Sequence, residues 1–325
     1  MNGPAVILGM TLLGSVFHTV SLEAQALPAS ALLPRSRVVI EHHPAATATF
    51  VPQPAVILSM IERGLTNLLQ QSTAREAWLS LITTQDVVGL KVFAAPGPTA
   101  GTRPAVVEAV VRSLLGAGLA PAQIIVWDKS ELDLRLAGYF ELGARHGIRV
   151  AGSADAGYDP QVAYEKPLLG RLIWGDLEFG QHQDGAGRRS HVSRLITREM
   201  TKIVSITPLL NHNQVGVSGQ LYGLALGSVD NTLRFESDPT RLAEVVPEIA
   251  AEHLYDRYLF GIVDALIAQY QGEARQLLHY SSVLNELWFS RDPVALDVLA
   301  IEELERQRQS ARLPGTKPAL DLYQN

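Results

Sequence analysis

The stretch from Thr201 to Arg234, TKIVSITPLLNHNQVGVSGQLYGLALGSVDNTLR, combines a strand pattern, a polar turn and a helix pattern, and it decides the fold class. Its first part, Lys202 to Ile206, is a short apolar run rich in β-branched residues, which is typical of a buried strand. Pro208 is expected to end this strand, because proline cannot donate to a sheet ladder. The stretch therefore predicts one strand–helix unit of an α/β protein.

The turn inside this stretch is dense in polar side chains. The cluster Asn211-His212-Asn213-Gln214 follows the strand, and glycines flank Ser218 just before an apolar run over 221–226. Ser218 is expected to cap a helix there, and Gly227 to end it. In α/β proteins, ligands bind at the carboxyl ends of the parallel strands. We therefore expect ligand contacts from the polar residues of the stretch, namely Asn211, His212, Asn213, Ser218, Asn231 and Arg234.

Strand and helix patterns alternate along the rest of the chain. Strands are predicted at 37–41, 86–93, 123–127, 148–150, 258–266 and 284–290. Helices are predicted at 54–71, 74–81, 102–115, 239–252 and 294–307, the last one capped by Asp292. No repeat and no linker interrupts this alternation. We therefore predict a single α/β domain over residues 27–325, with a mainly parallel sheet flanked by helices.

Residues 152–192 are rich in glycine, charge and proline, and they fit this pattern least. The alternation over 171–179 indicates a strand or a hairpin. His182, Asp184 and His191 could hold a metal ion, although their spacing matches no standard metal motif.

Two charged residues are expected at the same edge of the sheet as His212. Lys91 lies near the end of the strong strand over 86–93, and Asp128 directly follows the strand over 123–127. Lys91 either lays its alkyl stem along the core or directs a cation into the site. Asp128 is expected to contact a ligand.

A second expected binding element is the loop over 94–101, which leads into the helix opening Thr102-Arg103-Pro104. Thr102 is the expected N-cap, and Pro104 suits the first turn. A glycine-containing loop that follows a buried strand and enters a helix N-terminus suits an anion. Thr102 and Arg103 are therefore predicted to bind an anionic ligand. Neither the phosphate-loop nor the dinucleotide glycine signature is present.

Composition excludes several classes of function. The chain has 325 residues, a net charge of −6 and no cysteine. The absence of cysteine excludes disulfides, thiolate metal sites and cysteine-ligated iron–sulfur clusters. No basic run is present to neutralise phosphates, so we predict no nucleic-acid partner.

Residues 1–26 have the features of a signal peptide. An apolar core over 5–17 precedes Ala24-Gln25-Ala26, a cleavage pattern of small residues, although no Lys or Arg precedes Arg35. The alternative is a buried N-terminal helix. We expect a periplasmic or otherwise extracytoplasmic protein, the alternative being a cytoplasmic one. No other stretch is long and apolar enough for a membrane span.

The motifs together resemble a known family. The blocks VVGLKVF, TRP, IIVWD, TKIVSITPLLNHNQVGVSGQL and WFSRDPVALD follow the order found in the Domain of Unknown Function 362 family. The likeness covers about residues 38–308. It implies an α/β fold and, as in many members, export, but no established activity.

A more distant likeness is to the N-terminal domain of the nickel-dependent lactate racemase family. Thr102-Arg103-Pro104 resembles that family's nucleotide-contacting motif, and His212 with the glycine-flanked Ser218 resembles its catalytic segment. The likeness implies a catalytic or metal-ligating role for His212. Ten residues after His212, where that family has a cofactor-bearing lysine, this chain has Tyr222. A lysine-linked cofactor is therefore not expected.

Three hypotheses follow. The first is an enzyme that acts on a small anionic substrate by proton transfer or metal-assisted chemistry, with His212, Tyr222 and Lys91 as catalytic residues and His212 as a base or metal ligand. The second is a non-catalytic protein that binds a small ligand or a metal and has lost the family lysine. The third is a purely structural role for the polar turn.

Overall fold

A sheet of eight strands runs through residues 35–313, the part of the chain that the computed structural model describes. Its order is β1-β12-β11-β9-β4-β5-β6, with β10 paired to β9. Strands β11, β9, β4, β5 and β6 are parallel neighbours, whereas β1, β12 and β10 pair antiparallel. The predicted α/β fold with a mainly parallel sheet is confirmed. The strand bounds are β1 Val38–His42, β4 Val88–Lys91, β5 Ile124–Asp128, β6 Arg149–Gly152, β9 Lys202–His212, β10 Gly216–Val217, β11 Tyr258–Gln269 and β12 Ser281–Ser290.

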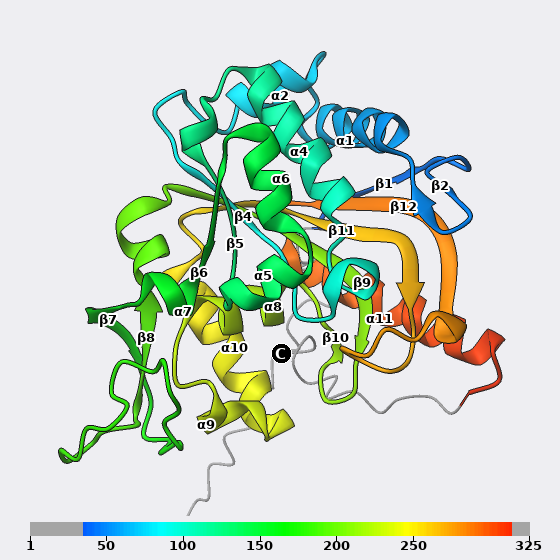
Figure 1. The fold of residues 1–325 in the computed structure, drawn as a ribbon. Helices are drawn as coiled ribbons and strands as arrows, with labels where there is room; N and C mark the ends of the chain where they lie inside the picture. Colours follow the sequence, from blue (N-terminus) through cyan, green and yellow to red (C-terminus); the bar gives the residue numbers. More distant parts are fainter. Residues whose placement is uncertain (1–34, 314–325) are drawn as a thin grey trace, which may run out of the picture. The chain divides into compact units, whose positions relative to one another are not determined.

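Helices cover both faces of this sheet (Figure 1). One face carries α1, α2, α4 and α6, and the other carries α8, α10 and α11. The longer helices are α1 Pro54–Leu69, α4 Pro104–Ala117, α6 Tyr139–His146, α8 Gln220–Ser228, α10 Pro239–His253 and α11 Pro293–Ser310. The shorter ones are α2 Ala74–Leu79, α3 Gly97–Ala100, α5 Glu131–Leu136, α7 Ser153–Ala156, α9 Leu233–Glu236 and the π-helix Leu195–Glu199.

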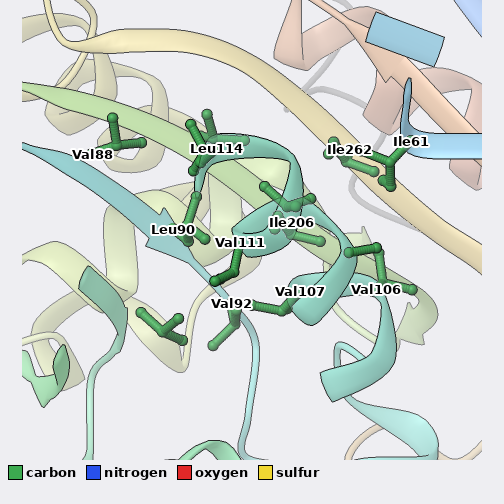
Figure 2. Packing of buried hydrophobic residues seen from close by; sticks show 14 of the residues in the cluster. Ile61, Val88, Leu90, Val92, Val106, Val107, Val111, Leu114, Ile206 and Ile262 are labelled. Atoms are coloured by element: carbon green, nitrogen blue, oxygen red, sulfur yellow. The ribbon is translucent and has the colours of Figure 1, made fainter. Parts of the chain in front are cut away.

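The central strands alternate between the two layers, which is why β4 reads as an almost continuous apolar run. Val88, Leu90 and Val92 pack with the α4 side (Figure 2), and Lys91 therefore lies on the α8 side. Each fully buried aliphatic side chain contributes roughly 1.5–3 kcal/mol. The partners shown with these three are Ile61, Val106, Val107, Val111, Leu114, Ile206 and Ile262.

The strand order reverses between β4 and β9. From β4 the chain adds β5 and β6 on one side, then β9 and β11 on the other. Ligands of open α/β sheets bind outside the carboxyl ends at such a switch point. In this chain Thr102 links the segment after β4 to β9 at the switch point. Its Oγ1 accepts from the Phe93 amide at 3.0 Å and donates to the Ile206 carbonyl at 2.7 Å.

The predicted end of the central strand at Pro208 is wrong, since β9 continues to His212. Pro208 pairs with β11 only, because β4 ends opposite Ser205. The Ile206 carbonyl points to the β4 side, and backbone groups two residues apart along a strand point the same way. The missing N–H of Pro208 therefore falls where no neighbouring strand would receive it.

Two predicted helix signals are also wrong. Ser218 does not cap α8: the carboxylate of Asp297, on α11, accepts from the Gln220 and Leu221 amides instead. Gly227 does not end α8, which continues to Ser228. The glycine makes room for Lys91, because a Cβ there would stand 2.1 Å from the lysine Cε.

The segment over 158–193 forms an antiparallel pair, β7 Tyr158–Glu165 and β8 Arg189–Ser193, joined by turns. Neither the strand nor the hairpin predicted over 171–179 is found, since these residues form turns and irregular backbone. A smaller pair, β2 Thr47–Ala48 and β3 Val51–Pro52, precedes α1. Within residues 35–313, no helix is both long and apolar enough to cross a bilayer. The predicted signal peptide, residues 1–26, lies outside the described residues and stays a prediction.

Candidate functional site

Lys91 and Asp128 form a buried ion pair at the carboxyl ends of β4 and β5. The lysine is 1% exposed, and its Nζ donates to Asp128 Oδ1 at 2.7 Å and to the Val92 carbonyl at 2.6 Å. The second carboxylate oxygen accepts from the Ala94 amide. The ammonium group is thus neither carried to solvent nor directed into an open site. Both predicted site residues are engaged with the chain itself.

Arg103 and Asp264 form a second buried pair, at the N-terminus of α4. Asp264 accepts from both the backbone amide and the guanidinium of Arg103, each at 2.9 Å. The same guanidinium donates to the Thr99 and Ile267 carbonyls. Arg103, and not Thr102, is the N-cap residue. An internal carboxylate therefore pairs with the groups that were predicted to hold an external anion, and the anion-binding role of Thr102 and Arg103 stays a prediction.

A cavity of about 300 Å³ opens beside this pair. Arg103 and Thr99 line one wall, the end of β11 another, and Phe50 of the β2–β3 turn a third. Gln276 closes part of it by accepting from the Thr99 hydroxyl at 2.7 Å. His212 and Tyr222 do not line this cavity, so it is a neighbour of the predicted catalytic residues and not their site.

His212 ends β9 with its ring fixed by the turn that follows. Its Nδ1 accepts from the backbone amides of Gln214 at 3.2 Å and Val215 at 3.4 Å. A neutral imidazole that accepts at Nδ1 carries its proton on Nε2. No side chain of residues 35–313 receives that Nε2–H, and the ring is half-buried. His212 therefore presents a hydrogen-bond donor at the edge of the sheet.

One aromatic ring packs against His212, and a second packs against the first. The Tyr222 ring of α8 lies 4.6 Å from that of His212 between centroids, and Phe93 lies 6.5 Å from Tyr222 in an edge-on arrangement. Burial raises the pKa of the Tyr222 phenol, and Glu236 and Glu273 raise it further. Tyr222 is therefore protonated at neutral pH and is a donor, not a base.

Two charged residues that the sequence did not single out are Glu236, which acts electrostatically on His212 and Tyr222, and its neighbour Lys129. The Lys129 ammonium donates to the Thr232 hydroxyl at 2.7 Å and lies 3.9 Å from the Glu236 carboxylate. Burial lowers the pKa of Lys129, although Glu236 and three aspartates oppose the shift. Lys129 follows Asp128 at the end of a strand, which was an available signal, whereas no local pattern marks Glu236 on the short helix α9.

We expect the pKa of His212 to lie below its ordinary value of 6.5. Burial disfavours the imidazolium, and the carboxylates of Glu273 and Glu236 oppose this only partly. Because the folded-state pKa is then below the unfolded one, the contribution of His212 to stability is complete above about pH 6.5. It is lost as the pH falls towards the folded pKa.

Long-range proton–nitrogen NMR spectra, titrated with pH, measure both the pKa and the tautomer. His212→Asn identifies the signal. A proton on Nδ1 in the neutral ring, or a pKa above 6.5, would contradict the described environment.

The asparagines beside His212 hold a loop in place. Asn211 is buried, and its side chain accepts from the Glu273 amide and donates to Asn213. The Asn213 amide in turn donates to the Glu273 carboxylate. Glu273 has a positive φ of 51°, a strained conformation for this residue type. The structure thus shows Asn211 and Asn213 positioning the loop of Glu273, which continues into the cavity-lining residues Gln276 and Leu277.

Asn231 and Arg234 lie in a different environment from His212. The Arg234 guanidinium is buried and donates to the carbonyls of Tyr164, Lys166 and Arg188. The Asn231 amide donates to the Gly187 and Arg189 carbonyls. Both side chains fasten the segment between β7 and β8 to the body, so the structure does not bring them to the predicted ligand site.

No group of three or more His, Asp or Glu side chains in residues 35–313 is placed to hold a metal ion. This includes His182, Asp184 and His191, whose predicted convergence is not found. The metal role of His212 stays a prediction without a supporting cluster. Tyr222 supplies a phenol where the racemase pattern has an amine, so the residue at that position does not fit a lysine-linked cofactor.

One family model and one solved structure can be set beside this chain. The model of the family described as "Domain of unknown function (DUF362)" matches residues 88–302, about two thirds of the chain. A crystal structure of a Thermotoga maritima protein, from a structural genomics consortium, is similar at 12% identity with a TM-score of 0.44. That match covers 81% of this chain and 60% of the other, so the chain spans less than two thirds of that protein. A search of curated proteins finds no match.

Proposed function

The chain belongs to the DUF362 family, and we propose that it binds a small carboxylate-bearing molecule beside His212 and moves a proton on it. One observation carries the proposal: the turn after β9 fixes the His212 ring so that Nε2–H faces outward. A neutral imidazole donor of this kind stabilises negative charge that develops on a carbonyl oxygen. Because the proton is on Nε2, His212 is a donor here and not the general base of the first hypothesis.

Two charged residues supply the other roles of the proposed site, namely binding of the substrate carboxylate and removal of a proton. Lys129 is placed to pair with a carboxylate, since within residues 35–313 its ammonium contacts only the Thr232 hydroxyl and, at 3.9 Å, the Glu236 carboxylate. Glu236 is half-exposed and acts electrostatically on both His212 and Tyr222. In the proposed step, Glu236 takes the proton from the carbon next to a carbonyl. The released electron pair moves into that carbonyl, whose oxygen accepts from His212, and return of the proton completes the reaction.

The test is exchange of solvent deuterium into a panel of short 2-oxo and 2-hydroxy carboxylates, followed by NMR. His212→Asn is the sharpest variant, because the asparagine oxygen can still accept from the turn amides while the outward N–H is lost. We expect this variant to exchange about 10²–10⁴-fold more slowly. His146→Gln, at the far end of α6, is the matched control and should exchange at the wild-type rate.

A non-catalytic binding protein is the second candidate, and a specific observation favours it. The buried cations Lys91 and Arg103 are both paired internally, and Tyr222 stands where the racemase pattern has its lysine. Calorimetric binding of a panel member without deuterium exchange would support this reading over the first. If the protein neither bound a panel member nor exchanged deuterium into one, a structural role for the His212 turn would be favoured.

A further inference from the structure

The segment between β7 and β8 carries an unusual outward surface. Leu169, Ile173, Trp174 and Phe179 are all exposed there, and Trp174 is 87% exposed. Trp174 and Phe179 form an edge-on ring pair with centroids 5.9 Å apart. We call these four residues the apolar tip. Figure 1 shows the segment that bears it extending from the central sheet below β7 and β8.

The backbone of the tip is held by acids that point inward. Asp176 accepts from the Ile173 and Asn231 amides, and Glu178 accepts from the Gly187 amide. Asp230, which lies two residues after the end of α8, accepts from the Leu177 amide. The carboxylates of Asp176 and Glu178 are therefore engaged with backbone amides of the chain. The exposed apolar side chains are presented on an ordered scaffold, not on a collapsed loop.

The charges left on the outside are mainly basic. Arg171 and Arg188 are exposed, and neither forms an ion pair within residues 35–313. Arg189 is exposed but pairs with Glu165 at 3.1 Å. Asp184 is the exposed acid of the connecting turns. Exposed aromatic and aliphatic side chains flanked by unpaired arginines suit the boundary between anionic headgroups and acyl chains.

We propose that the apolar tip docks on the surface of a bilayer that contains anionic lipid. Trp174 and Phe179 enter the headgroup region, and Arg171 and Arg188 contact the headgroups. The binding is peripheral, and it does not depend on the function proposed for the His212 site.

The four tryptophans of the chain provide the test, because Trp78, Trp127 and Trp288 are buried and Trp174 alone is exposed. Emission is recorded with vesicles of phosphatidylcholine and with an equimolar mixture of phosphatidylcholine and phosphatidylglycerol. We expect the mixed vesicles to shift the emission to the blue, to protect it from iodide quenching and to sediment the protein. Trp174→Ser should abolish the shift and weaken sedimentation. Tyr255→Ser removes another exposed aromatic, which is 72% exposed just after α10, and should change nothing.

The arginines are tested separately. Arg171→Gln/Arg188→Gln should weaken binding to the mixed vesicles by about fivefold for each arginine, and the exposed control Arg291→Gln should not. An unchanged emission with mixed vesicles would overturn the proposal. So would an emission that is already blue-shifted and protected in the protein alone, which would mean that a second copy or the chain itself covers the tip. The molecular mass from light scattering then distinguishes coverage by a second copy from coverage by the chain itself.

Discussion

Replacing Asp264 by alanine is expected to lower the free energy of unfolding by about 3–5 kcal/mol, because it leaves the Arg103 guanidinium buried without its counter-ion. Arg103 is 4% exposed, and Asp264 is completely buried. The substitution also removes the acceptor of the Arg103 and Leu266 amides. Urea denaturation of the wild type and the variant measures the difference.

The double variant Arg103→Met/Asp264→Leu is the control for this result. Replacing both partners of a buried ion pair by apolar side chains is often close to neutral, so the double variant should recover most of the loss. If Asp264→Ala alone cost less than about 1 kcal/mol, Arg103 would have another anionic partner or access to solvent. Its predicted role as a ligand-binding residue would then be favoured.

The fold was predictable because its signals are local. The alternation of apolar strands with amphipathic helices recurs along the chain, and hydrophobic periodicity responds to burial directly. The segment over 171–179 shows the limit of this reasoning. Its alternating side chains suggested a strand, but Asp176 and Glu178 bind backbone amides of the segment and fold it into turns.

The site was predictable only in part, because its pairings are distant in sequence. Thr102 and Ser218 are good local candidates for helix caps. However, Asp264 accepts from the Arg103 amide, 161 residues away, and Asp297 accepts from the Gln220 amide, 77 residues away. A buried carboxylate that satisfies backbone amides competes successfully with a nearby hydroxyl. Sequence reasoning thus placed Lys91, Asp128, Arg103 and other residues at the carboxyl edge but could not show which of them neutralise one another.

Replacing Gly227 by alanine is expected to be the other strongly destabilising change, although alanine is the better helix former. A Cβ at position 227 would lie 2.1 Å from Lys91 Cε and 2.8 Å from its Nζ. The lysine cannot move aside without leaving Asp128 and the Val92 carbonyl. Disrupting a buried pair costs about 3–5 kcal/mol, against a gain in helix propensity of up to about 1 kcal/mol. The expected net loss is about 2–4 kcal/mol, measured by urea denaturation.

Gly223→Ala is the matched control, because Gly223 is buried in the same helix. A Cβ at that position meets only Thr207 Cγ2, at the ordinary contact distance of 3.7 Å. Gly223→Ala should therefore stabilise the protein by about 0.5–1 kcal/mol. The opposite signs of the two variants would identify the clash with Lys91, and not a general intolerance of α8, as the cause. Equal effects at both positions would show that Lys91 can relax into space beside α8, and the ion pair with Asp128 would then not be fixed in place.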